Sequence, residues 1–205
     1  MERKKILTGL IALVLFLLFY FTFFSSSEKT YQETIEKERS EKDWFMKNSR
    51  ESPFSTSKKE FKSLSYFPIA GKYNIVADFE KIEGGKVRLM PTNDGVEEPY
   101  REYGYASFNW EGKPCRLLIL ELMEEGPAQG KLWLGFGDLT SAGETYGGGR
   151  YLDVDQEKGR IIQLDFNKAY NPYCAYGEGF SCPLPPPENL LNIEIRAGEK
   201  SFHHP

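Results

Sequence analysis

The residues best suited to chemistry gather between positions 135 and 200, in a stretch rich in glycine, proline and tyrosine. This stretch includes GETYGGGR, in which Arg150 follows three glycines. Consecutive glycines can turn several N–H groups toward one anion, and an arginine adds a bidentate guanidinium for a carboxylate or phosphate. The alternative, which a lone arginine in such a turn favours, is a tight structural loop. Arg150 would then pair with a nearby carboxylate of Asp138, Glu144 or Asp153.

Three carboxylates of the same stretch could supply a pair for acid–base work or glycoside cleavage: Asp138, Glu144 and Asp165. Such a pair needs a defined separation, which a sequence does not give. Asp165 follows a predicted strand, where an aspartate usually caps a turn, and Asp138 has the same favoured interpretation. Tyr146 belongs to a tyrosine group that lines a sugar or peptide pocket or fills the end of a barrel.

Two of the three cysteines, Cys174 and Cys182, lie in one loop region and could form a disulfide, share a metal or supply a reactive thiol. A structural zinc site normally needs four ligands, and only Cys115 remains as a third cysteine. A nucleophilic cysteine needs a neighbouring histidine or a helix N-terminus. A disulfide is therefore the favoured interpretation outside the cytoplasm, and no metal site is predicted.

Several functional classes conflict with the sequence. Its only histidines, His203 and His204, lie at the C-terminal end, which rarely holds an imidazole in a packed catalytic or metal site. GETYGGGR lacks the Lys-Ser/Thr of a P-loop, and the strand-rich pattern provides no helix for a dinucleotide fingerprint. The net charge of −4 and the lack of a basic stripe argue against nucleic acid as a partner. No cofactor is predicted.

The N-terminal segment predicts a membrane anchor. Residues 6–24 are uncharged and long enough to cross a bilayer. The basic residues before them place the N-terminus in the cytoplasm and the rest of the chain outside. A cleavable signal peptide is the alternative, but the apolar span exceeds the usual length of about 7–15 residues. We expect residues 1–27 to be an uncleaved signal anchor, which makes the chain a single-pass membrane protein. The alternative is that the segment is cleaved and the domain is secreted.

The pattern after the anchor predicts short helices and then strands. Residues 28–50 form a charged stalk helix with favourable i,i+4 pairs, and a capping box at 57–60 opens a short helix through about Leu64. Strands joined by short turns are expected at residues 73–80, 86–91, 100–110, 113–123, 131–137, 160–166 and 191–196. This order predicts a mainly β, antiparallel barrel or sandwich-like domain over residues 51–200, with a disordered tail at 201–205.

Long irregular strings in the C-terminal half resemble a bacterial family known as a domain of unknown function, family 1684. They are GDLTSAGETYGGGRYLD, LDFNKAYNPYCAY and CPLPPPENLLNIEIRAGEK. The likeness covers roughly residues 41–200 and implies a shared fold and a shared loop surface. It implies no activity, substrate or catalytic residue, and the anchor is not part of it.

These observations favour a binding or interaction module over an enzyme, although they leave the question of activity open. The expected ligand is a small anionic or sugar-like molecule held at the Tyr/Gly/Arg loop surface by Tyr146, Arg150 and their carboxylate neighbours. The alternative is a hydrolase that works through Asp138, Glu144 and Asp165, with Arg150 holding an anionic substrate.

Overall fold

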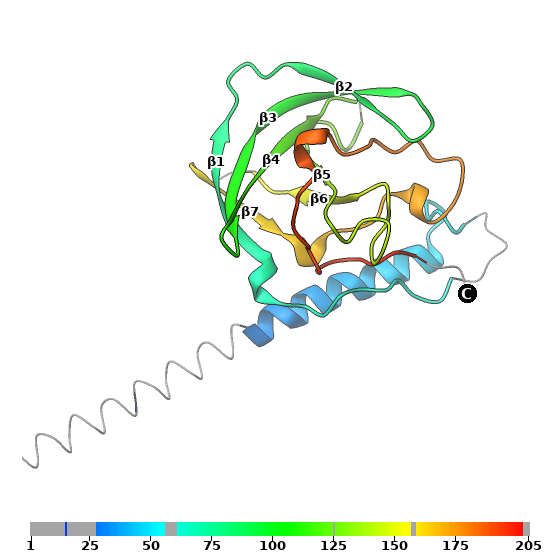
Figure 1. Cartoon of the computed structure of the whole chain (residues 1–205). Coiled ribbons are helices and arrows are strands. Elements are labelled where there is room, and N and C mark those ends of the chain that lie inside the picture. The colour runs from blue at the N-terminus through cyan, green and yellow to red at the C-terminus, as the bar shows by residue number, and fades with distance from the viewer. Residues whose placement is uncertain (1–14, 16–27, 56–60, 125, 157–158, 203–205) are drawn as a thin grey trace, which may run out of the picture. The chain divides into compact units, whose positions relative to one another are not determined.

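The computed structural model describes residues 15, 28–55, 61–124, 126–156 and 159–202 of the chain (Figure 1). The chain divides into two compact units, residues 1–42 and 43–205. The helix expected over residues 28–50 covers residues 28–48. In the first unit it carries the exposed i,i+4 pairs Lys29–Glu33 and Lys37–Glu41, each at 3.8 Å, which stabilise a helix only slightly.

Two of the N-terminal predictions fall partly or wholly outside the described residues. The span expected at 6–24 lies outside them except for Leu15, and no described helix is long and apolar enough to cross a bilayer. The capping box at 57–60 also lies outside. The short helix predicted to follow it is wrong for Phe61–Leu64, which is not helical. The Leu64 N–H donates to the Asp43 Oδ1 at 3.0 Å instead of to a carbonyl one turn earlier.

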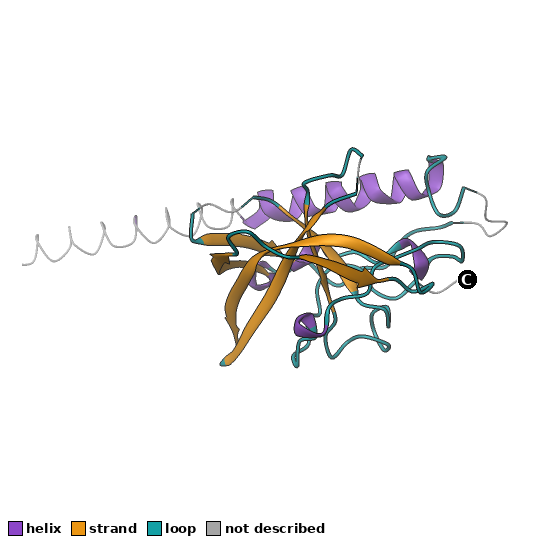
Figure 2. Cartoon of the chain, turned by 90° about the horizontal axis from the view of Figure 1, so that it is seen from above, coloured by secondary structure: helices purple, strands orange, loops and turns teal. Residues whose placement is uncertain are grey.

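The second unit is built on one antiparallel sheet curled into a half-barrel (Figure 1), so the prediction of a mainly β fold is confirmed. The strand order is β6-β5-β4-β3-β1-β7, with β2 paired to β3. The longer loops gather to one side of the strands (Figure 2). The strands are β1 (Asn74–Lys81), β2 (Val87–Pro91), β3 (Glu97–Trp110), β4 (Lys113–Leu122), β5 (Leu132–Phe136), β6 (Arg150–Val154) and β7 (Ile161–Asp165).

Both faces of the central strands are covered, which explains the continuous apolar run in β4. Leu117 and Ile119 belong to the main core, whereas Leu118 and Leu120 belong to a second cluster on the other face. All four side chains are 0% exposed. A run of this kind is typical of a strand buried on both faces, and it makes β4 the rigid centre of the domain.

The predicted and observed strands differ in two places. The strand β6 (Arg150–Val154) was missed, because it follows a glycine run that is typical of a loop. Residues 191–196 are not a strand, although their side chains alternate between buried and exposed. This segment bonds to the chain at Gly137–Leu139 and then offers the Ile195 carbonyl to the Arg150 side chain instead of to a neighbouring strand.

Candidate functional site

Arg150, the centre of the sequence hypothesis, is buried at the start of β6 with 1% of its side chain exposed. Its Nη2 donates to Asp138 Oδ2 at 2.6 Å and to the Ile195 carbonyl at 2.8 Å. Its Nη1 donates to the carbonyls of Ala197 and Glu199. Burial lowers the pKa of the Arg150 guanidinium and Asp138 opposes that shift. The guanidinium fastens the C-terminal segment to the sheet and is not presented to a ligand.

Asp138 combines the two structural roles that its sequence position suggested. Besides the ion pair with Arg150, its Oδ1 accepts from the backbone N–H of Thr140 at 2.6 Å and from the Thr140 hydroxyl at 2.5 Å. Its own N–H donates to the Ser141 Oγ at 3.1 Å. The carboxylate is 0% exposed, so it is saturated by its turn and its arginine rather than poised for acid–base work.

The glycine run before Arg150 meets a packing requirement. Gly149 has φ +87°, and a Cβ at this position would lie 2.5 Å from Pro185 Cγ and 2.8 Å from the Phe136 carbonyl oxygen. A side chain larger than hydrogen has no room there. The run therefore allows the loop to approach β5 and the proline segment closely, which accounts for its composition without an anion.

The remaining site predictions lie in separate surroundings. Exposed Glu144 accepts from Arg196 Nε at 2.8 Å. Asp165 caps the 3-10 turn η2 (Phe166–Lys168), where its Oδ1 accepts from the Asn167 N–H at 3.1 Å, as the capping interpretation proposed. Tyr146 is half-buried, and its ring lies close above Gly148. Each of the three carboxylates thus has a partner of its own: Arg150 for Asp138, Arg196 for Glu144 and the Asn167 N–H for Asp165.

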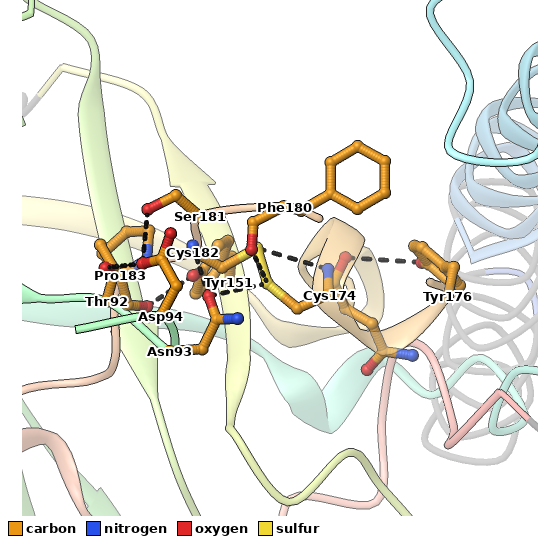
Figure 3. The surroundings of a disulfide bond; sticks show 11 residues. Thr92, Asn93, Asp94, Tyr151, Cys174, Tyr176, Phe180, Ser181, Cys182 and Pro183 are labelled. Atoms are coloured by element: carbon orange, nitrogen blue, oxygen red, sulfur yellow. Dashed lines mark hydrogen bonds between the residues drawn. A yellow bond between two sulfur atoms is a disulfide. The ribbon is translucent and has the colours of Figure 1, made fainter. Parts of the chain in front are cut away.

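The structure joins Cys174 and Cys182 in a disulfide with a Cα–Cα distance of 6.4 Å (Figure 3). The Cys182 N–H donates to Asn93 Oδ1 at 2.7 Å, and the Ser181 hydroxyl donates to Asp94 Oδ1 at 3.1 Å. Asn93 and Asp94 lie in the β2–β3 turn. The bond therefore staples a loop that is already hydrogen-bonded to this turn, while Cys115 is buried and free.

A buried polar cluster that no motif announced lies where the C-terminal segment meets η3 (Tyr173–Ala175). Glu199 is 0% exposed; its Oε1 accepts from the Tyr176 hydroxyl at 2.5 Å and from Asn171 Nδ2 at 2.9 Å. Burial, reinforced by Glu199, raises the pKa of the Tyr176 hydroxyl well above its ordinary value. All three residues fall within the strings that carry the family resemblance, which was their only signal in the sequence.

Asn189 is a second structural residue that sequence reasoning missed. It is 0% exposed, and its side chain bonds to the N–H and carbonyl of Leu118 at 2.7 and 2.9 Å and to the Gly135 carbonyl at 2.8 Å. These contacts tie the end of η4 (Pro187–Asn189) to β4 and β5. The chain that follows, from Leu190 onward, is therefore held in a fixed position and can line a surface.

A cleft of about 490 Å³, here called the Lys113 cleft, opens at the β3–β4 turn. This turn is built from Glu111 and Gly112, both with positive φ, and it places Trp110 beside Lys113 at the cleft wall. The lining residues are Lys72, Tyr73, Trp110, Glu111, Lys113, Leu139, Ile193, Glu194 and Arg196. The cleft combines an aromatic and aliphatic floor with three cations and two carboxylates at its rim.

The cations of the Lys113 cleft differ in how far they are neutralised. Arg196 pairs with Glu144 at 2.8 Å and with Glu194 at 3.0 Å. Lys72 lies 3.7 Å from Glu111 and about 5 Å from the Tyr73 and Trp110 rings. The Lys113 ammonium has a single polar contact among the described residues, the Asn192 carbonyl at 3.5 Å. An exposed ammonium with one long contact keeps donors free for a ligand.

A second hollow of about 440 Å³, the Leu190 groove, lies on the other side of Leu139. Three leucines in it are unusually exposed: Leu139 at 58%, Leu184 at 37% and Leu190 at 63%. Much of its floor is glycine backbone, at Gly137 and residues 147–149. A Cβ at Gly137 would lie 2.9 Å from Leu190 Cδ2, so a side chain there would require Leu190 to shift.

No metal centre accompanies these hollows in the part of the chain that the structure describes. Within residues 28–55, 61–124, 126–156 and 159–202, no group of three or more histidine, cysteine, aspartate or glutamate side chains could hold an ion. The two hollows themselves present charged groups, aromatic rings and apolar side chains.

Comparison with known proteins places this geometry in a family. Residues 59–200 match the family described as protein of unknown function DUF1684. The chain belongs to this family. A solution NMR structure of an uncharacterized protein of Haloarcula marismortui is 31% identical, with a TM-score of 0.65, and the match covers 85% of this chain and 96% of that one. No curated protein matches the chain significantly.

The family match covers the sheet and the loops that line the two hollows. It includes the Arg150 network, the disulfide and all residues of the Lys113 cleft and the Leu190 groove, but it begins after the helix over residues 28–48. The family description carries no activity, so the function is argued from the site alone.

Proposed function

We propose that this DUF1684 domain is a binding module whose site is the Lys113 cleft and whose ligand is a small molecule with an anionic group. The observation that carries the proposal is the exposed Lys113 ammonium, which has one polar contact at 3.5 Å among the described residues. Charge-assisted hydrogen bonds to a carboxylate or phosphate are about twice as strong as neutral ones. An anion at this position gains such bonds without first breaking an ion pair.

The form of the cleft supports a ligand with a body as well as a charge. Its volume of about 490 Å³ suits a small molecule, and Ile193 and Leu139 give it an apolar wall. Tyr73 and Trp110 stack with ring centroids 5.1 Å apart and form a firm base. A sugar acid, which combines a ring with a carboxylate, satisfies both features and unites the anionic and sugar-like ligands that the sequence suggested.

The hydrolase alternative receives no comparable support. It requires two carboxylates that face one substrate with different proton affinities. Of the three residues named for it, Asp138 is consumed by Arg150, Glu144 by Arg196 and Asp165 by the cap of η2. Binding is therefore the function for which the geometry offers free groups.

We also propose that the domain is held on the outer side of a membrane by residues 6–24. The proposal rests on the charge pattern of the N-terminal sequence and on the Cys174–Cys182 disulfide, since disulfides persist mainly outside the cytoplasm. Protease added to intact cells should degrade the domain and leave the N-terminus protected. Protection of the whole chain until the cells are lysed would contradict this orientation.

The ligand proposal is tested with the full chain in lipid nanodiscs, using acetate and glucuronate as anionic probes and glucose as the neutral one. Saturation-transfer difference NMR should show both anions binding, glucuronate more tightly than acetate. Lys113→Gln should weaken glucuronate binding by about tenfold or more, the loss of one charge-assisted hydrogen bond. Lys131→Gln is the matched control, because Lys131 is also exposed but lies outside the cleft.

Three results would overturn the proposal. The first is equal glucuronate binding to wild type and Lys113→Gln. The second is no saturation transfer from either anion above the level of empty nanodiscs. The third is glucose binding as tight as glucuronate binding, because recognition would then depend on the ring and not on the charge.

A further inference from the structure

The Lys113 cleft and the Leu190 groove form two halves of one surface. Leu139 lines both hollows. The segment from Leu190 to Arg196 lines the groove with its first part and the cleft with its second. Residues 190–192 line the groove, and Ile193, Glu194 and Arg196 line the cleft. Lys113 itself reaches the Asn192 carbonyl at the boundary between them. A ligand that enters the cleft therefore has an adjoining apolar path available.

The two halves differ in chemistry. The cleft rim carries Lys72, Lys113 and Arg196 beside the carboxylates of Glu111 and Glu194, whereas the lining of the groove contains no lysine or arginine. Its one carboxylate, Asp138, is consumed by Arg150. Besides the polar side chains of Ser141 and Asn192, the groove presents three exposed leucines, Pro185 and glycine backbone. Clustered exposure of this kind marks an interaction site more often than isolated apolar residues do.

We propose that the whole surface binds a single-chain anionic amphiphile of the fatty-acid type, with its carboxylate beside Lys113 and its alkyl chain along the Leu190 groove. The inference rests on the proposed function of the cleft and extends it to a class of ligand. Charge complementarity selects this occupant: a carboxylate matches the Lys113 ammonium, the cation of the cleft without an ion-pair partner among the described residues, and an alkyl chain matches the adjoining apolar half. Each methylene buried in the groove should tighten binding by about fourfold.

The geometry also indicates why the groove can accept a chain without rearrangement. Asn189 is bonded to β4 and β5 immediately before Leu190, and Leu191 and Ile193 are bonded to the backbone at Gly137 and Leu139. The groove walls are thus held by hydrogen bonds that do not involve the exposed leucine side chains. A preformed site of this kind loses little ordering entropy on binding.

The test uses the full chain in lipid nanodiscs and a ten-carbon carboxylate that carries a photoreactive diazirine at its tail. The alcohol of the same length is the neutral counterpart. After irradiation, mass spectrometry of peptides locates the label. The carboxylate should label the peptides around Leu184 and Leu190, with the alcohol labelling them at least about threefold less.

Variants separate the two halves of the site. Leu190→Glu should lower labelling of the groove by about tenfold, while Leu89→Glu should leave it unchanged, because Leu89 is similarly exposed at 55% but lies on β2. Lys113→Gln should remove the preference for the carboxylate over the alcohol. Thermal unfolding of each variant verifies that the fold persists.

The outcomes distinguish this inference from the proposed function. Glucuronate binding that depends on Lys113, together with groove labelling that Leu190→Glu does not reduce, would overturn the amphiphile and leave the cleft proposal intact. Failure of both would overturn both. If Leu190→Glu instead abolishes chemical cross-linking between copies of the chain, the groove is a protein interface and the amphiphile inference is wrong.

Discussion

Arg150 and Lys113 are both cations of the second unit, but their surroundings are opposite. Arg150 is 1% exposed, with four hydrogen bonds from its two Nη atoms, whereas Lys113 is exposed with one long contact. Arg150 lies in the most distinctive stretch of the sequence, and Lys113 is the first residue of β4, directly after an ordinary two-residue hairpin turn. The difference teaches that distinctive loop composition here marks a demanding backbone shape, while the free charge lies elsewhere.

The largest effect should come from breaking the buried pair. Arg150→Met should destabilise the domain by about 3–5 kcal/mol, because it leaves the Asp138 carboxylate buried and unpaired. Urea unfolding followed by tryptophan fluorescence measures the change in free energy of unfolding. The double variant Arg150→Met/Asp138→Asn should recover part of the loss, since it removes the orphaned charge and keeps an acceptor for Thr140. A stable Arg150→Met protein would show that the contrast with Lys113 is overstated.

Removing the disulfide should have the next largest effect. Cys174 and Cys182 are 8 positions apart, and closing a loop of this size stabilises a fold by about 2–3 kcal/mol in the chain-entropy account. The double variant Cys174→Ser/Cys182→Ser should lose this amount in the same unfolding assay. Reductant should destabilise wild type equally and leave the double variant unaffected. Identical wild-type curves with and without reductant would mean that the staple adds nothing to the contacts of Asn93 and Asp94.

Much of the fold followed from the sequence because period and turn chemistry are local. The apolar run of β4 and the Glu111–Gly112 turn located the central hairpin correctly. Residues 191–196 show where local reasoning ends. Their side chains do alternate between buried and exposed, but their backbone bonds to Gly137–Leu139 and, through the Ile195 carbonyl, to the Arg150 side chain, both distant in the sequence.

The candidate site was harder to predict because it depends on what is left unpaired. Arg150 and Lys113 are equally charged in a sequence, and only the three-dimensional structure shows that Asp138 and three carbonyls occupy the first. The Leu190 groove likewise brings together Gly137, Leu184 and Leu190, which no periodicity connects. The sequence singled out residues 135–200, which supply only part of the lining of the Lys113 cleft and do not include Lys113 itself. It could not distinguish a saturated donor from a free one.

The buried tyrosine hydroxyls of the domain should make its free energy of unfolding depend on alkaline pH. Burial raises the pKa of the hydroxyls of Tyr100, Tyr151, Tyr170 and Tyr176. The unfolded chain therefore releases these protons near pH 10, before the folded chain does, so stability is fully present below about pH 10 and falls above it. Each tyrosine adds a loss of about 1.4 kcal/mol per pH unit while it remains protonated only in the fold.

Unfolding measured between pH 8 and about pH 11 checks the sign of this dependence. Tyr151→Phe removes one of these protons, so the fall in the free energy of unfolding above about pH 10 should become shallower by about 1.4 kcal/mol per pH unit. Replacement of Tyr173, which is more exposed than Tyr151, is the control and should alter the slope less. A free energy of unfolding that rises with pH over this range would contradict the burial of these hydroxyls.

Lys113→Gln should have the smallest effect on stability, and it tests the contrast between Lys113 and Arg150 most directly. Lys113→Gln should leave the urea midpoint unchanged, because the ammonium is exposed and has a single 3.5 Å contact. The same substitution should weaken glucuronate binding, and raising the salt concentration should weaken binding to wild type through screening of an exposed charge. Salt should not bring Arg150→Met closer to wild type in stability, since a buried pair is screened far less. If Lys113→Gln destabilises the domain as much as it weakens binding, Lys113 supports the fold as Arg150 does, and the contrast between the two cations disappears.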